Sequence, residues 1–259
     1  MNSMKITALL SLSLLSSVSY AELTAAEKKD IQQLIQAFKT NNVNVISQQV
    51  NYPLKRDQPL PAIQNASEML KWFDQVFDAP FRQSIAASSL EDWQEVGWRG
   101  IMFKRGEMWL RSKADAPNEP LKIMVVNYSG AAEQKLRQHL LTQQKNKLHP
   151  SMRAFSEPKL VFKTQHYLVR IDELSNGQMR YAAWKHPFDV SSKPELVLNK
   201  GELRVEGTAR NESYYFKSGP YRYEINYFRV GEKSNPPINL AVYKNDKIIL
   251  NESGHLIEE

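Results

Sequence analysis

Three tryptophans and two arginines crowd one short stretch in the first half of the chain. Trp93, Trp98 and Trp109 lie within 17 residues, and Arg99 and Arg111 closely follow two of them. Aromatic rings beside a guanidinium can stack on a planar ring or a sugar while the arginine binds a carboxylate. The same rings can instead form the core of a domain that lacks cysteine. Trp93, Trp98, Arg99 and Trp109 are therefore the candidate ligand-binding residues, with core packing as the alternative.

The sequence carries no recognisable catalytic motif. It has no cysteine nucleophile, and no Gly-x-Ser-x-Gly, His-Glu-x-x-His or phosphate-loop pattern. Glu91 and Asp92 are adjacent carboxylates that can serve acid–base chemistry. Their position just after Ser88 and Ser89 instead favours a helix start, where the helix dipole stabilises negative charge. We therefore predict no catalytic residue and no cofactor.

The five histidines are scattered along the chain, at positions 139, 149, 166, 186 and 255. His166 and His186 lie at equal distances from Asn176 and can face each other across a hairpin. A zinc site needs at least one more protein ligand, and the sequence names none. We interpret the histidines as structural or surface residues and predict no metal site.

The first 21 residues have the pattern of a secretory signal. Lys5 precedes the apolar run 6–15, and Ser19-Tyr20-Ala21 supplies the small residues of a cleavage site. The apolar run is shorter than the roughly 20 residues that span a bilayer. We expect cleavage after Ala21 and a periplasmic or secreted protein without a transmembrane segment.

The length and the net charge of the chain limit the classes of partner that it can bind. Residues 22–259 are long enough for one large core or two small ones. The formal net charge of +6 falls to +5 when Lys5 is removed, and it is too evenly spread for a nucleic-acid-binding face. We expect a small ligand or a cell-envelope protein as the partner, and no nucleic acid.

Residues 22–130 predict helices followed by a small antiparallel sheet. Thr24 with Glu27 forms a capping box, and Asn65 with Glu68 opens a further helix that runs to Phe77. A hairpin is expected where residues 98–103 and 107–111 flank Lys104-Arg105-Gly106. This part is therefore of the α+β class.

This order of elements resembles the NTF2-like (cystatin-like) cone fold over about residues 23–130. The segments that carry the resemblance are Ile31–Phe38, Tyr52–Leu54, Met69–Phe77, Gly97–Ile101 and Met108–Leu110. It implies helices packed on a curved sheet that leaves a pocket. Some members of this fold are enzymes with an Asp/His pair there, and many only bind. The absence of histidine before His139 favours binding.

Residues 131–154 predict a basic linker helix that ends at His149-Pro150. Ala132, Leu136, Leu140 and Leu148 would share its apolar face, and the charged side chains would lie in water.

Residues 155–259 predict an all-β antiparallel sandwich or open barrel. Turn signals at Asn176-Gly177, Gly201-Glu202, Gly219-Pro220 and Asn245-Asp246 separate the expected strands. In residues 180–184, Tyr181 and Ala183 would face one side of a strand and the residues between them the other. On the run 221–228, Tyr221, Tyr223, Ile225 and Tyr227 alternate with more polar positions. We interpret these aromatic residues as core.

Three function classes are compatible with the sequence. The first is a non-catalytic exported binding protein for a small ligand, a cell-wall fragment or a protein. The second is a protein-blocking module, such as an inhibitor of a wall-degrading enzyme or a toxin immunity protein. The third is an NTF2-like hydrolase or isomerase that uses Glu91 or Asp92. Without a base, a nucleophile and an orienting group together, binding is preferred.

Overall fold

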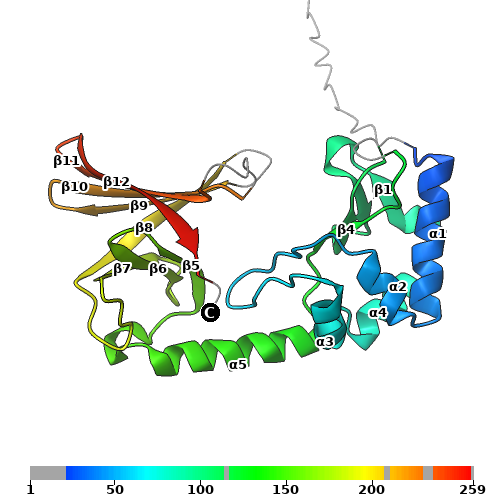
Figure 1. Cartoon of the computed structure of the whole chain (residues 1–259), viewed down its shortest axis with the longest axis horizontal. Coiled ribbons are helices and arrows are strands. Elements are labelled where there is room, and N and C mark those ends of the chain that lie inside the picture. The colour runs from blue at the N-terminus through cyan, green and yellow to red at the C-terminus, as the bar shows by residue number, and fades with distance from the viewer. Residues whose placement is uncertain (1–21, 114–116, 207–210, 230–235, 258–259) are drawn as a thin grey trace, which may run out of the picture.

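The computed structural model describes residues 22–113, 117–206, 211–229 and 236–257. The predicted signal, residues 1–21, lies outside these ranges. An N-terminal part of helices and a small sheet is followed by an all-β part, as the sequence predicts. The long helix α5 (Ala131–Lys147) runs beneath both parts and joins them (Figure 1).

Four helices open the N-terminal part: α1 (Ala25–Lys39), α2 (Val43–Gln48), α3 (Ala66–Val76) and α4 (Ala79–Ala86). The capping box of Thr24 and Glu27 is confirmed, and Asn65 caps α3 by accepting from the Glu68 N–H. Helix α4 was not expected from the sequence. It begins because Asp78 caps the Phe81 N–H, while Pro80 fits the first turn, where no N–H partner is needed.

A four-stranded antiparallel sheet completes this part, in the order β1 (Trp93–Glu95), β2 (Ile101–Phe103), β3 (Met108–Leu110) and β4 (Ile123–Val126). Its core is rich in phenylalanine. Phe77 contacts the rings of Phe38, Phe73 and Phe81 at centroid distances of 5.4, 5.3 and 6.0 Å. The helices and the sheet thus enclose a filled aromatic core.

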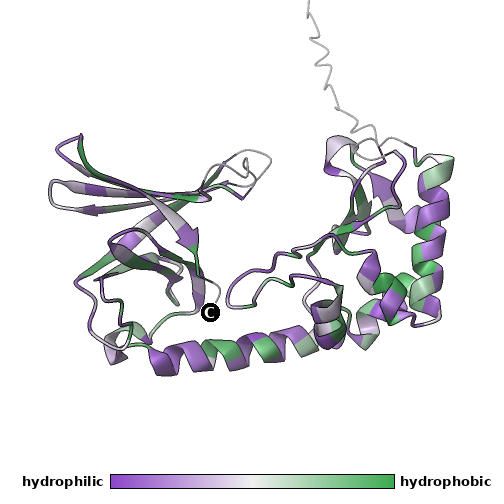
Figure 2. Cartoon of the chain, in the orientation of Figure 1, coloured by the Kyte–Doolittle hydropathy of each residue, from purple (hydrophilic) through white to green (hydrophobic). Residues whose placement is uncertain are grey.

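Helix α5 packs on the outer wall of the all-β part. Its buried positions are Glu133, Leu141 and Gln144, followed by Leu148 at its end. Of the predicted apolar face, Leu148 is buried and Ala132, Leu136 and Leu140 are half-buried, so the buried face is rotated from the predicted one rather than opposite to it. Figure 2 shows hydrophilic and hydrophobic turns alternating along this helix. The apolar pattern was weak, and the buried polar contact of Gln144 decides the orientation.

That polar contact belongs to a buried charge network. The carboxylate of Asp172 accepts from Arg170 Nε and from Arg180 Nη2, both at 2.7 Å. Arg170 Nη2 also donates to Gln144 Oε1 at 3.2 Å, and Arg180 donates to the carbonyl oxygen of Met152. The network fastens the end of α5 and the following turn to the β wall.

The all-β part is a closed barrel of eight antiparallel strands in sequential order. They are β5 (Glu157–Lys163), β6 (Tyr167–Glu173), β7 (Met179–Lys185), β8 (Leu196–Glu206), β9 (Asn211–Ser218), β10 (Tyr221–Tyr227), β11 (Ile238–Lys244) and β12 (Lys247–Leu256). The expectation of a sandwich or an open barrel is corrected, because β12 pairs with β5 at two positions and closes the wall.

Gly201 shows why one predicted turn is wrong. Gly201-Glu202 lies inside the continuous strand β8, which pairs with β7 along its first half and with β9 along its second. A Cβ on Gly201 would lie 2.1 Å from the Phe216 ring. The glycine is needed for this close approach inside a strand. The turns at Gly177, Gly219 and Asn245-Asp246 are confirmed by positive φ angles.

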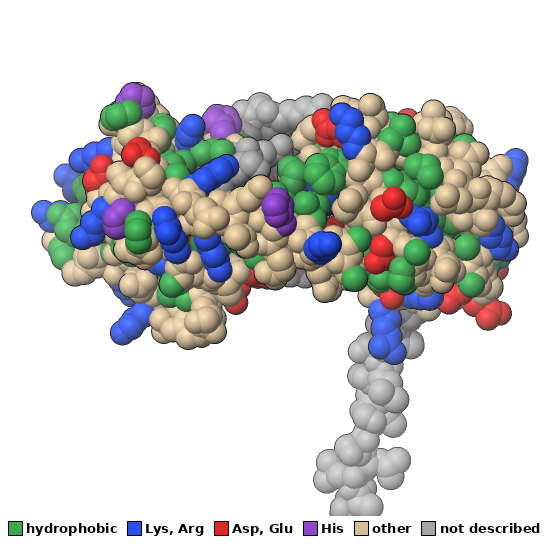
Figure 3. All heavy atoms as spheres, turned by 90° about the horizontal axis from the view of Figure 1, so that it is seen from below, with side chains coloured by type: hydrophobic (Ala, Val, Ile, Leu, Met, Phe, Trp, Pro, Cys, Tyr) green, Lys and Arg blue, Asp and Glu red, His purple; other side chains and the backbone are tan. Residues whose placement is uncertain are grey.

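Polar contacts join the two parts beside α5. Arg137 donates from Nη1 to the Gln58 carbonyl oxygen at 2.5 Å, and Lys55 Nζ donates to that of Arg229 at 2.9 Å. Lysine and arginine side chains are spread over both parts on the face seen in Figure 3. Within the described ranges, no helix has both the length and the apolar character needed to cross a bilayer.

Candidate functional site

The tryptophans predicted to bind a ligand have three different environments. Trp93 is a core residue: it lies opposite Phe103 with ring centroids 4.6 Å apart, and its indole N–H donates to Ser88 Oγ at 3.3 Å. Trp109 pairs with Met102 on the other face of the same strands and is half-buried. Trp93 therefore packs in the core, which was the alternative to a ligand-binding role.

Trp98 lies on the surface, outside the sheet. The expected strand from residue 98 begins only at Ile101, and a short 3₁₀ turn, Gly97–Arg99, precedes it. Gly97 and Gly100 both have positive φ, and a Cβ on Gly100 would lie 2.1 Å from the Leu110 carbonyl oxygen. The turn leaves 67% of Trp98 exposed, with the Arg99 guanidinium 5.8 Å from its ring centroid.

The expected hairpin of residues 98–103 and 107–111 would place Trp98 and Trp109 on neighbouring strands, but the residue opposite Trp109 is Met102. One row of residues, with Trp93, faces the core, and the adjacent row, with Trp109, faces away. The four candidates do not converge on one pocket. Only Trp98 and Arg99 remain together, as an exposed pair, and their ligand role stays a prediction.

The carboxylates and histidines considered from the sequence also have local partners. Ser89 caps the short turn Leu90–Asp92, and Asp92 accepts from the Ser89 N–H at 2.9 Å, which confirms a helix-start role. His166 and His186 do lie opposite each other, joined by a backbone hydrogen bond. The His166 ring, however, binds Glu252 at 2.5 Å, and the His186 ring packs on Phe188.

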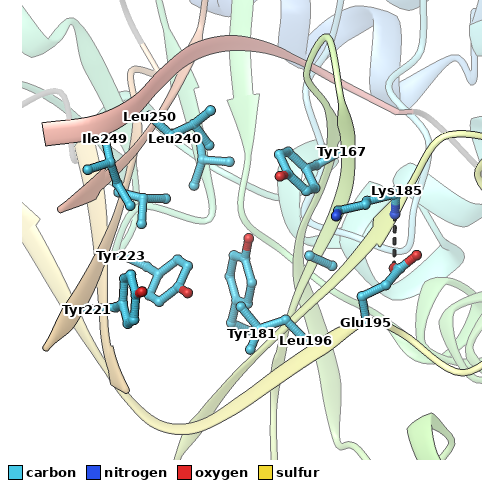
Figure 4. A pocket seen from close by; sticks show the side chains of 12 residues that line it. Tyr167, Tyr181, Lys185, Glu195, Leu196, Tyr221, Tyr223, Leu240, Ile249 and Leu250 are labelled. Atoms are coloured by element: carbon cyan, nitrogen blue, oxygen red, sulfur yellow. Dashed lines mark hydrogen bonds between the residues drawn. The ribbon is translucent and has the colours of Figure 1, made fainter. Parts of the chain in front are cut away.

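A cavity of about 330 Å³ lies inside one end of the barrel (Figure 4). This end of the barrel carries the β5–β6, β7–β8, β9–β10 and β11–β12 connections, and we call it the open end. Four tyrosines and a set of aliphatic side chains line it. These residues are Tyr167, Tyr181, Ala183, Lys185, Glu195, Leu196, Tyr221, Tyr223, Leu240, Val242, Ile249 and Leu250.

The cavity ends where large side chains fill the barrel. Phe162, Phe216, Tyr214 and Ile238 are fully buried in the barrel interior, and the Phe216 ring lies 5.5 Å from that of Tyr181. An eight-stranded barrel is only just wide enough for its inward side chains or for one small ligand. At the open end small Ala183 stands where a larger side chain would fill the space, so the interior stays hollow.

Tyr181 is the central polar group of this cavity. Only 2% of the residue is exposed, and Figure 4 shows its hydroxyl pointing into the hollow towards Tyr167 and Tyr223. No hydrogen bond joins this hydroxyl to another group in the described part of the chain. Burial raises the pKa of Tyr181, and Tyr223, Tyr167 and Glu252 raise it further. The phenol is therefore protonated at neutral pH and available as a donor.

Two charged residues stand at the mouth. Glu195 accepts from the backbone N–H of Lys185 at 2.9 Å, which fixes its carboxylate. The Lys185 side chain leans towards the hollow in Figure 4, and its ammonium forms no ion pair with a described residue. The mouth thus offers one cation beside an apolar interior.

A second hollow, of about 630 Å³, lies between the two parts. The loop around Lys55–Gln64, the start of α5 and the ends of β5, β10 and β12 line it. Arg56 is held there by the Pro61 carbonyl oxygen at 2.8 Å and lies 5.7 Å from the Trp72 ring centroid. This groove is polar and mixed in charge, in contrast to the barrel cavity.

Sequence reasoning missed the barrel cavity although its residues were noticed. The alternation of Tyr221, Tyr223, Ile225 and Tyr227 placed them on one face, which points inward as expected. Tyr181 and Ala183 share that interior, whereas Ala182 and Trp184 face α5, as the alternation predicted. The available signal was tyrosine, rather than phenylalanine, at several inward positions.

Comparisons of the chain with protein-family models, with curated proteins and with solved structures found no significant match.

Proposed function

We propose that this protein is an exported, non-catalytic binding protein whose barrel cavity holds a small, largely apolar molecule. The observation that carries the proposal is the Tyr181 hydroxyl, which points into the cavity and makes no hydrogen bond with the described residues. A ligand oxygen inside the cavity can accept from this hydroxyl, and such a hydrogen bond contributes about 0.5–1.5 kcal/mol.

The lining sets the character of the ligand. Aliphatic walls from Leu240, Val242 and Leu250 favour an apolar body, and the tyrosine hydroxyls favour an acceptor in its middle. Because its pKa is raised, Tyr181 acts as a hydrogen-bond donor rather than as a base. An acidic group on the ligand would meet Lys185 at the mouth.

The test uses the neutral fluorophore N-phenyl-1-naphthylamine, titrated into the purified protein. We expect saturable binding that Ala183→Leu weakens about tenfold or more, because the added side chain occupies the cavity. Tyr215→Phe, on the outer face of β9, is the matched control and should leave binding unchanged. Equal binding by the wild type and Ala183→Leu would overturn the proposal.

The N-terminal part is proposed to be an NTF2-like cone. Its helices α1 to α4 precede the antiparallel sheet β1–β4, in the order expected of that fold. Its interior is the phenylalanine core, so a ligand pocket in this part is not proposed. Export to the periplasm or the exterior rests on the sequence of residues 1–21 alone.

A second candidate function, protein blocking, is favoured by the Trp98–Arg99 pair. Exposed tryptophan and arginine are the residue types that most often dominate protein interfaces. The positive φ angles of Gly97 and Gly100 hold this turn away from the sheet. Trp98→Ala should abolish capture of an envelope protein that the wild type retains, while naphthylamine binding stays unchanged. Equal capture by both would rule this candidate out.

A further inference from the structure

The open end of the barrel carries the only adjacent pair of large exposed aliphatic residues in the described ranges. Ile248 and Ile249 are 47% and 53% exposed, directly after the β11–β12 turn, and Ile249 also lines the cavity. In Figure 1 the β9–β10 and β11–β12 hairpins project beyond strands β5–β7 at this end of the barrel. The apolar pair therefore stands at the edge of the mouth, where another surface can meet it.

Lysines surround this apolar edge. Six of them are exposed at the open end, and none forms an ion pair with a described carboxylate. They are Lys163, Lys185, Lys193, Lys217, Lys244 and Lys247.

Five described carboxylates lie at the same end. Glu224 pairs with Arg222, Asp246 lies 3.8 Å from the same guanidinium, and Glu252 binds His166. Glu195 and Asp189 accept hydrogen bonds from neutral groups, which do not neutralise a carboxylate. The six lysines and Arg222 outnumber these five carboxylates, so the end carries a net positive charge.

We propose that the open end docks on an anionic lipid surface and that the cavity takes up one acyl chain of an amphiphile from that surface. The inference rests on the proposed ligand role of the cavity. Apolar side chains flanked by lysines suit the boundary between acyl chains and anionic headgroups. A cavity that opens directly beside Ile249 lets an acyl chain enter without crossing water.

The cavity chemistry agrees with such a ligand. Leu196, Val242 and Leu250 would surround a chain of methylene groups, and the Tyr181 hydroxyl can donate to an ester oxygen in the middle of the ligand. Lys185 at the mouth is placed to meet a carboxylate or a phosphate. The cavity walls and Lys185 together therefore require a ligand with an apolar chain that ends in an oxygen-rich anionic group.

Vesicle flotation tests the docking. We expect the protein to float with vesicles of phosphatidylethanolamine and phosphatidylglycerol, and not with vesicles of phosphatidylcholine alone. Two double variants, Ile248→Ser with Ile249→Ser and Lys244→Gln with Lys247→Gln, should each weaken binding about tenfold or more. Val205→Ser removes an equally exposed aliphatic residue from β8 and should change nothing.

A pyrene-labelled fatty acid tests the uptake and separates the two proposals. Wild type and the Lys244→Gln with Lys247→Gln variant, whose changed residues lie outside the cavity lining, should bind it from solution, whereas Ala183→Leu should not. Naphthylamine and fatty-acid binding without flotation on anionic vesicles would overturn the docking inference and leave the proposed function standing. If the wild type binds neither naphthylamine nor the fatty acid, both the proposed function and the docking inference are overturned. If the isoleucine variant fails to fold, the lysine variant and the loss of flotation at high salt decide the docking.

Discussion

The interiors of the two parts are both aromatic, yet one is filled and the other is hollow. In the N-terminal part, phenylalanine rings contact one another around Phe77 and leave the core closed. In the barrel, tyrosines face a cavity of about 330 Å³. Phenylalanine can be packed on every side, whereas a tyrosine hydroxyl must meet a polar partner or a space that holds one. Tyrosines at inward positions therefore mark the hollow interior better than the density of aromatic residues does.

The largest effect should come from emptying the filled interior. Phe77→Ala removes a fully buried ring with three ring neighbours and should lower the free energy of unfolding by about 3–5 kcal/mol. Urea unfolding measures it. Phe228→Ala, at an exposed position, is the control and should stay within about 0.5 kcal/mol. A loss below 1 kcal/mol for Phe77→Ala would mean that this core is not closed.

The buried charge network between the barrel wall and α5 comes next. Asp172→Asn leaves Arg170 and Arg180 without their anionic partner and should cost about 3 kcal/mol, since unpaired buried charges are strongly unfavourable. Thermal unfolding measures the loss. Asp246→Asn, in an exposed turn, should have almost no effect. Similar melting temperatures for the two variants would contradict a structural role for the network.

A matched pair of enlargements compares the interiors directly. Ala37→Leu inserts a side chain into the filled core and should cost about 1–3 kcal/mol. Ala183→Leu, at an equally buried site, points into the cavity and should cost less than about 1 kcal/mol, because the space is already there. Urea unfolding of both variants gives the difference. Equal costs would mean that the barrel is as tightly packed as the N-terminal core.

The smallest effect concerns pH. Burial raises the pKa of Tyr181 above its unfolded value of roughly 10, so its contribution to stability is present below pH 10 and is lost as the pH rises beyond it. Tyr181→Phe removes this dependence. Between pH 9 and 11 the free energy of unfolding should fall less steeply with pH for the variant than for the wild type. The two slopes should differ by up to about 1.4 kcal/mol per pH unit. Identical slopes would place the Tyr181 hydroxyl in water.

Local sequence signals predicted local structure well. Capping residues placed α1 and α3, and turn residues placed the hairpins at Gly177, Gly219 and Asn245. These signals act over a few residues, through hydrogen bonds and φ angles that neighbouring positions decide. The change from α+β to all-β near residue 150 was visible for the same reason, as a change in the period of apolar residues.

Long-range packing decided the rest. Gly201 was predicted to lie in a turn, but it lies inside a strand where the Phe216 ring packs against it. The predicted apolar face of α5 did not include Gln144, which is buried and accepts from Arg170. Trp98 and Trp109 look like cross-strand neighbours, but two glycines with positive φ turn the chain before the strand begins. Barrel closure and the hollow beside Tyr181 follow from the meeting of β12 with β5, residues almost one hundred positions apart. The sequence by itself determined the elements and which residues alternate on them. Only the tertiary structure decided which alternating face was filled and which was left open, because a cavity is the space that side chains from distant strands leave between them.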